Sequence, residues 1–276
     1  MTQTTPQRPP VRRKRRRQRR PGLLRLLLLL AVLLAGFLIL RGMDGGLLRW
    51  TTRLEENPLK PSDFTTVGGY VTCTAVPTRR GVDVSQYQEE VDWQQVYESG
   101  IDFAFVRIGY RGNTSGELYA DDLARQHLTG AKEAGLDVGV YFYSQAVSSE
   151  EAVEEARWCL DFLGDTALDL PVVYDWEWVG GDARTANMDR ETLTGCVRAF
   201  CDTIEEAGYR SMIYFNSHVS RDLLDLQTLQ GRPFWFAQYR DAMDYEYKVD
   251  IWQYTETGTV PGIKGKVDID LMFLYG

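Results

Sequence analysis

Two carboxylates lie two residues apart in an otherwise apolar segment, VVYDWEW at residues 172–178. Successive side chains of a β-strand point to opposite faces, so Asp175 and Glu177 share one face and Trp176 lies on the other. Two carboxyls on an apolar floor repel each other and are poorly solvated, which raises the pKa of at least one. A protonated acid beside an ionised one is what cleavage of a glycosidic bond requires. A single acid at a strand end is more often an ion-pair or capping residue.

Further acids fall in the first and last of the expected strands, where Asp83 and Asp268 stand. Aromatic and amide side chains gather at strand ends; flat rings stack on sugar rings, and amides bond hydroxyl and acetamido groups. The candidates for such substrate binding are Tyr143, Gln145, Tyr214, Asn216, Gln238, Tyr239, Trp252 and Gln253. The alternative for each aromatic residue is the core, where strand aromatics usually pack.

Metal and cofactor motifs do not emerge from the sequence. It holds no CxxC pair and only two histidines, His127 and His218, so we expect neither a zinc site nor a cofactor. Four cysteines allow three fully paired connectivities, and Cys159 is able to join Cys196 or Cys201 across adjacent helices if they pair at all.

From about residue 80, short β-rich runs alternate with amphipathic stretches, as in parallel strands with helical crossovers. We expect eight strands, at residues 81–85, 103–110, 137–144, 170–178, 211–216, 234–239, 249–254 and 267–273. We expect helices at 93–99, 121–134, 148–163 and 190–207, and almost none after Leu226. The fold class is therefore α/β: a modified TIM-type β/α barrel of eight strands and about five helices, whose later strands lack helices. Closure of the barrel makes the first and last strands neighbours, so Asp83 and Asp268 face one pocket with Asp175 and Glu177 opposite.

The amino terminus differs in composition from the rest. Ten Lys or Arg and no acid stand in residues 1–25, whereas the remainder holds all 39 acids and only 21 of the 31 basic residues. The strongly negative charge of the chain outside residues 1–25 argues against a broad face that binds nucleic acid. An apolar run at 26–40, extended back to residue 22, approaches the roughly 20 residues that span a bilayer.

These segments predict a basic cytoplasmic tail at 1–21, a transmembrane signal-anchor at 22–40, an extracytoplasmic stalk at 41–79 and a catalytic domain at 80–276. The positive-inside rule places the amino terminus in the cytoplasm and the domain outside the cell, on a single-pass cell-membrane protein. A cleaved signal peptide is the alternative, although no small-x-small cleavage site follows Leu40. Oligomeric state has no signal in the sequence.

The motifs, in their order along the chain, resemble glycoside hydrolase family 25, the Chalaropsis-type lysozymes or N-acetylmuramidases. They are GVDVSQYQ-x4-WQQV at 81–96, VGVYFYSQA at 138–146, LPVVYDWEW at 170–178, FWFAQY at 234–239 and IWQYTETGTVPGIKGKVDIDLMF at 251–273. The resemblance implies hydrolysis of the β-1,4 bond between N-acetylmuramic acid and N-acetylglucosamine in peptidoglycan, with net retention. It implies that Glu177 is the proton donor, and that Asp175 is either the nucleophile or the group that orients the substrate's acetamido. Asp83 and Asp268 then position substrate and tune the charges.

Two other functions stay open at this point. A non-catalytic peptidoglycan-binding barrel would keep the fold without the chemistry, although such a module has no need of a proton donor. A chitinase-like glycosidase also places a strand-four Glu beside Asp, but typically within a longer acidic motif, and residues 170–174 contain no acid.

Overall fold

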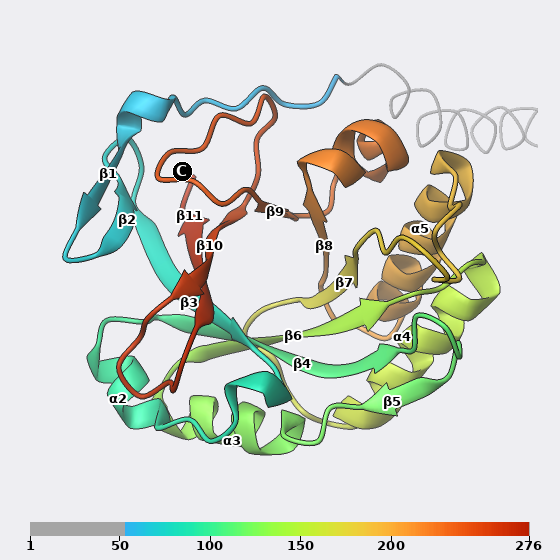
Figure 1. Ribbon diagram of the computed structural model, residues 1–276, viewed down its shortest axis with the longest axis horizontal. Helices are drawn as coiled ribbons and strands as arrows, with labels where there is room; N and C mark the ends of the chain where they lie inside the picture. Colours follow the sequence, from blue (N-terminus) through green and yellow to red (C-terminus); the bar gives the residue numbers. More distant parts are fainter. Residues whose placement is uncertain (1–52, 276) are drawn as a thin grey trace, which may run out of the picture. The chain divides into compact units, whose positions relative to one another are not determined.

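The computed structural model describes residues 53–275, and Figure 1 shows them as a ring of strands with helices outside it. The ring consists of β3 (Thr78–Val84), β4 (Phe103–Arg111), β6 (Asp137–Ser144), β7 (Val172–Trp176), β8 (Ser211–Asn216), β9 (Phe234–Ala237), β10 (Ile251–Gly258) and β11 (Val267–Phe273). Each strand pairs with the next around the ring, and β3 pairs with both β4 and β11, which closes the barrel. Only β11 runs antiparallel to its two neighbours in the ring. The predicted closed eight-stranded barrel is confirmed.

Helices cover only the first part of the barrel, as predicted. They are α2 (Trp93–Glu98), α3 (Ala124–Ala134), α4 (Ser149–Leu163) and α5 (Arg190–Glu206), seen along the bottom and right of Figure 1. After β8 the described residues form one π-helical turn, η4 (Val219–Leu223), and one 3₁₀ turn, η5 (Leu226–Leu229). The helix starts follow from local chemistry: Ser148 Oγ accepts the Glu151 backbone N–H, and the Asp189 carboxylate accepts that of Thr192.

Strand alternation sorts the apolar side chains into two layers. Val173, Trp235 and Phe105 belong to a cluster inside the barrel, whereas Tyr174 and Trp176 belong to the layer between strands and helices. Trp176 is fully buried there, so the residue between the two acids of β7 points outward as the period of two predicts. Asp175 and Glu177 consequently point the opposite way, toward the mouth of the barrel.

The described part of the segment expected to be a stalk is folded against the barrel. Residues 64–73 form a hairpin of β1 (Phe64–Val67) and β2 (Tyr70–Cys73), at the left of Figure 1. Its two-residue turn, Gly68 and Gly69, has φ values of 61° and 87°, which glycine adopts without strain. The Phe64 ring meets the Trp252 ring edge-on at 5.0 Å, and Val71 is buried. The folded unit thus includes residues 53–79 in addition to those from 80 onward.

Two smaller outcomes concern cysteines and membrane spans. All four cysteines lie in the described residues and are free thiols; Cys159 on α4 and Cys196 and Cys201 on α5 are buried. The pairing that the sequence left open is therefore absent. None of the helices within residues 53–275 is long and apolar enough to cross a membrane. The predicted tail and anchor, 1–21 and 22–40, lie outside the described residues.

Candidate active site

A cavity of about 270 Å³ opens where the strands of the barrel end, and all four predicted acids line it. Asp83 comes from β3, Asp175 from β7, Glu177 directly follows β7, and Asp268 comes from β11. Asp83 and Asp268 are directly opposed in the β3–β11 pairing. The barrel thus gathers acids from distant parts of the sequence around one cavity. The full lining is Asp83, Ser85, Tyr87, Gln88, Arg107, Tyr141, Tyr143, Asp175, Glu177, Tyr214, Trp235, Tyr239, Gln253, Glu256 and Asp268.

Burial dominates the electrostatics of the β7 pair. Desolvation, and then the charge of Glu177, hold the pKa of Asp175 well above its usual range. Burial also raises the pKa of Glu177; a hydrogen bond with Tyr214 opposes that rise, and the charge of Glu256 adds to it. Asp175 is 7% exposed, and within the described chain its Oδ1 has no hydrogen-bond partner. An unpaired oxygen at a cavity wall is available to a bound molecule.

The β3–β11 wall carries three further carboxyls. Burial and the charges of Glu256 and Glu177 raise the pKa of Asp268 to about 7. Asp83 has a pKa raised well above its usual range by burial and by the charges of Asp268 and Asp270. Asp270 lies beneath the cavity, fully buried, and accepts the Trp235 indole N–H at 2.9 Å. So many crowded carboxyls favour a partly protonated cluster near neutral pH.

Arg107 is the only cationic residue among those lining the cavity. Its guanidinium donates to Asp121 Oδ2 from Nε at 3.0 Å and from NH2 at 2.9 Å, and it lies 5.1 Å from the centre of the Tyr87 ring. Its charge opposes the rise in the pKa of Asp175. Arg107 thereby favours the ionised form of Asp175 against the effects of burial and of Glu177.

Gln253, on β10, connects the two walls. Its Nε2 donates to Asp83 Oδ2 at 2.7 Å, and its Oε1 accepts the Tyr214 and Tyr239 hydroxyls at 2.9 and 3.2 Å. The cavity therefore holds several buried carboxyls in a hydrogen-bonded frame. Such a frame is able to protonate a leaving oxygen and to stabilise a positively charged carbon.

Comparison with known proteins agrees with this arrangement. The family model described as glycosyl hydrolases family 25 matches residues 82–263, which contain Asp83, Asp175 and Glu177. The chain belongs to glycosyl hydrolase family 25. The autolytic lysozyme of Clostridium acetobutylicum is 28% identical over 194 residues, which cover 69% of this chain and 55% of the relative. Lysozyme M1 of Streptomyces globisporus is 24% identical over 228 residues, covering 79% and 74%.

Solved structures share the fold. The modular autolysin LytC of Streptococcus pneumoniae superposes with a TM-score of 0.64 at 24% identity, over 76% of this chain and 52% of LytC. A family 25 glycosyl hydrolase of Bacillus anthracis gives 0.58 at 23% identity, over 72% and 89%. The match thus spans only about half the length of the clostridial and pneumococcal relatives.

Four of the eight predicted substrate-binding residues line the cavity of this family 25 domain: Tyr143, Tyr214, Tyr239 and Gln253. Three others have structural contacts instead. Gln145 is buried; its Nε2 donates to the Glu177 carbonyl at 3.2 Å, and its Oε1 accepts from Thr185 at 2.5 Å. Asn216 Oδ1 accepts two backbone N–H groups at the start of η4. Trp252 is 0% exposed and packs under the β1–β2 hairpin.

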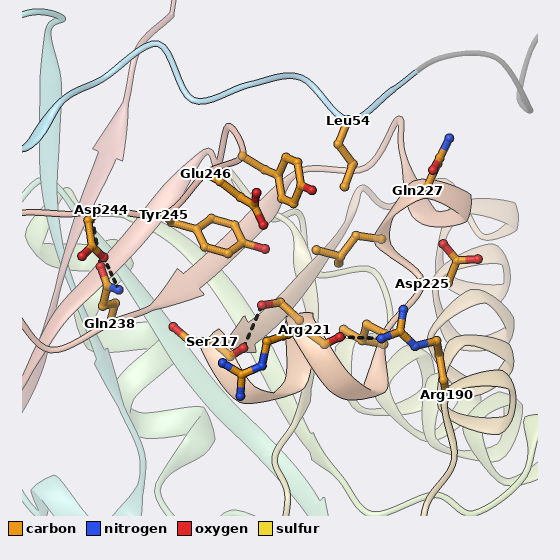
Figure 2. Close-up of a pocket in the computed structure, with 14 residues that line it drawn as sticks. Leu54, Arg190, Ser217, Arg221, Asp225, Gln227, Gln238, Asp244, Tyr245 and Glu246 are labelled. Atoms are coloured by element: carbon orange, nitrogen blue, oxygen red, sulfur yellow. Dashed lines mark hydrogen bonds between the residues drawn. The ribbon is translucent and has the colours of Figure 1, made fainter.

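The eighth, Gln238, lines a second hollow of about 500 Å³, shown in Figure 2. Its Nε2 donates to Asp244 Oδ1 at 2.6 Å. Arg190 reaches the Arg221 carbonyl along another side of this hollow, and Leu54 comes from the amino-terminal segment. Gln238 therefore lies beside the acid cavity, next in sequence to Tyr239, and not within it.

Sequence reasoning missed several cavity residues of the family 25 domain. Arg107 had a readable signal, since it is the lone charge in the apolar run FAFVRIGY. Tyr141 and Trp235 each lie two residues before an inward-facing residue of the same strand, Tyr143 and Ala237, and so face inward as well. Glu256 had no such signal, because a bulge in β10 after Gln253 changes which residues face inward. Within residues 53–275, no group of three or more His, Cys, Asp or Glu is arranged to hold a metal ion.

Proposed function

We propose that this chain hydrolyses the β-1,4 bond between N-acetylmuramic acid and N-acetylglucosamine in peptidoglycan, with net retention at the anomeric carbon. The observation that carries the proposal is one cavity shared by Glu177, Asp175, Asp83 and Asp268. Family 25 membership, and the name lysozyme borne by the clostridial and Streptomyces relatives, point to the same bond.

Glu177 is the general acid in this mechanism. Burial and the nearby Glu256 charge raise its pKa, which favours the protonated form that this role requires. It gives that proton to the glycosidic oxygen as the bond from that oxygen to the anomeric carbon breaks. It then takes a proton from the water whose oxygen bonds to the anomeric carbon. Water is consumed, and Glu177 returns to its starting state.

Asp175 faces the positive charge that develops on the sugar. Its unpartnered Oδ1 and the moderating charge of Arg107 suit a carboxylate that meets the substrate directly. It acts either as the covalent nucleophile or by orienting the substrate's acetamido group for attack. A glycan lacking the acetamido carbonyl separates these roles, since only the covalent route remains open to it.

The decisive experiment incubates the full chain with purified peptidoglycan and analyses the new reducing ends. Muramic-acid reducing ends are expected, and Glu177→Gln should abolish them while leaving the circular dichroism spectrum unchanged. Binding without cleavage by the wild type would favour the non-catalytic barrel. Cleavage of chitin but not of peptidoglycan would favour the chitinase-like alternative.

We also propose that residues 22–40 tether the enzyme to the cell membrane, with residues 1–21 in the cytoplasm and the barrel outside. The apolar run and the ten preceding basic residues support this orientation. The full chain should stay in the membrane fraction after an alkaline wash, and protease added outside the cell should digest the barrel. Recovery of the chain in the wash would overturn the tether.

A further inference from the structure

Glu177 lies just beyond the regular part of β7, at the start of the loop that leads to α5 (Figure 1). The pairing of β7 with β6 ends at Trp176, and its pairing with β8 ends at Asp175. Asp175 is therefore held by a neighbouring strand on each side, whereas Glu177 follows the last paired residue on both sides. Contacts outside the sheet must contribute to the position of the proposed proton donor.

The side chain of Gln145 makes such a contact. Gln145 directly follows β6, as Glu177 directly follows β7, and it is 0% exposed. Its Nε2 donates to the Glu177 backbone carbonyl at 3.2 Å, and its Oε1 accepts the Thr185 hydroxyl at 2.5 Å. A carbonyl only accepts, so the amide has one orientation, with its nitrogen toward Glu177. The amide thus links the two chain segments one residue past the last backbone pair, Ser144 and Trp176.

Gln145 also holds the loop that follows Glu177. Thr185, which donates to its amide oxygen, is 0% exposed. Arg184, the preceding residue, donates to the Gln145 backbone carbonyl at 3.1 Å and to both carboxylate oxygens of Glu151 at 2.7 Å. The loop therefore leaves Gln145 at Glu177 and returns to it at Thr185, so one buried amide joins both points of the loop.

We propose that Gln145 is a positioning residue for proton transfer, because its amide sets the backbone of Glu177 and so the place of the carboxyl that protonates the leaving oxygen. This inference rests on the proposed function, in which Glu177 is the general acid. A misplacement of about 1 Å in a reacting group can cost about 100-fold in rate. Gln145 acts through Glu177 and not on the glycan, since it is fully buried and is not among the residues that line the cavity.

Two kinds of substrate separate this role from a general effect on folding. Glycan cleavage expels a sugar oxygen, which is a poor leaving group unless Glu177 protonates it as its bond to the anomeric carbon breaks. A dinitrophenolate leaves as a stable anion and needs no proton. Misplacement of Glu177 should therefore slow cleavage of the glycan and spare a dinitrophenyl β-glycoside of the disaccharide N-acetylglucosaminyl-N-acetylmuramic acid. A loss of folded protein, or of Asp175, would slow both reactions.

The test replaces Gln145 by methionine, which has a similar length and no amide, in the full chain. For soluble peptidoglycan oligomers kcat/KM should fall about 10- to 100-fold, whereas for the dinitrophenyl glycoside it should change less than about threefold. Thr185→Val keeps the Nε2 donor but removes the hydroxyl that holds Oε1, so it should give the same selectivity with a smaller loss.

Thr194→Val is the matched control for Thr185→Val. Thr194 is 5% exposed on α5, and its hydroxyl oxygen accepts the Asp225 backbone N–H at 3.0 Å. Neither Thr194 nor Asp225 is among the residues that line the acid cavity. Thr194→Val therefore breaks a buried hydrogen bond of the same kind and should show no selectivity between the two substrates.

A purely structural role for Gln145 predicts a different outcome. Losses in Gln145→Met that are equal on the two substrates, or absent on both, would overturn the positioning role. If circular dichroism shows that Gln145→Met does not fold, Thr185→Val decides in the same way: a loss confined to the oligomers supports the inference, and an equal or absent loss overturns it. A wild type inert on both substrates would refute the proposed function, whereas an active wild type with unselective variants would refute this inference alone.

Discussion

Asp83 and Asp268 lie directly opposite each other where β3 and β11 pair antiparallel. Like charges facing each other across an antiparallel pair destabilise a sheet. Burial strengthens their repulsion, and the pKa of both carboxyls is raised, that of Asp268 to about 7. The strand pair that closes the barrel therefore carries an electrostatic cost that depends on pH.

The first prediction is that the protein loses stability as pH rises. A carboxyl whose pKa is higher in the folded than in the unfolded state binds its proton more tightly when folded. Its contribution is complete below about pH 4 and disappears as the pH passes the folded value, near 7 for Asp268. The urea midpoint should be lower at pH 8 than at pH 5, and Asp268→Asn should reduce that difference.

An exposed carboxyl on α4 provides the control for this measurement. Asp161→Asn should retain the whole wild-type difference between pH 5 and pH 8, because Asp161 lies in solvent. If Asp268→Asn also retained it, the opposed pair would not be the source of the pH dependence.

The second prediction concerns Asp175, whose carboxyl is buried beside Glu177 with one oxygen unpartnered. Asp175→Asn should reduce hydrolysis by about 100-fold or more, because the developing positive charge loses its carboxylate. The same substitution removes a buried repulsion, so the urea midpoint should hold or rise, a trade-off common at active sites. Asp182→Asn, an exposed acid in the loop that follows, should change neither quantity. Activity retained in Asp175→Asn would remove this residue from the mechanism.

The sequence was sufficient to predict where the acids meet. The apolar strands alternated with helices regularly enough to predict a closed barrel, and closure makes Asp83 and Asp268 neighbours. The alternation of side chains along β7 was enough to place Trp176 on the opposite face from the two acids, because that strand is regular.

The alternation of inward- and outward-facing side chains did not predict which residues of β10 line the cavity. Two β10 residues stand opposite one β11 residue between Gln253 and Thr255, and this bulge turns Glu256 into the cavity. Trp252 was expected at the substrate, yet it is core because the β1–β2 hairpin covers the outer face of β10 where no helix does. That hairpin comes from a Gly-, Thr- and Pro-containing segment without sustained periodicity, so its docking depends on tertiary contacts that the sequence pattern does not reveal.

The third prediction separates a buried from an exposed ion pair on one guanidinium. Arg111 contacts the fully buried Glu155 at 2.7 Å and Glu154, whose side chain is 60% exposed, also at 2.7 Å. Arg111→Met leaves Glu155 buried without its cation and should cost about 3–5 kcal/mol of unfolding free energy. Glu154→Gln should cost at most about 1 kcal/mol, since exposed pairs contribute little.

The pH dependence of this loss has a definite sign. Burial already raises the pKa of Glu155 to about 7. Removing the cation raises it further, so the destabilisation by Arg111→Met should be larger at pH 8, where wild-type Glu155 is ionised, than at pH 5. Urea unfolding at the two pH values measures both quantities. Equal losses in Arg111→Met and Glu154→Gln would contradict a buried, charged pair.

The fourth prediction assigns a substrate contact to Tyr87, an exposed ring on the cavity wall. Tyr87 is 74% exposed, in the 3₁₀ turn η3 (Gln86–Gln88), and its ring lies over the Arg107 guanidinium. A flat ring held in this way offers a face for a sugar, and aromatic stacking contributes about 0.5–1.5 kcal/mol. Tyr87→Ala should raise KM for soluble glycan oligomers about fivefold with little change in kcat. Tyr97→Ala is the matched control, since Tyr97 is 48% exposed on α2 and does not line the cavity. Equal KM values for the two variants would show that Tyr87 does not contact the glycan.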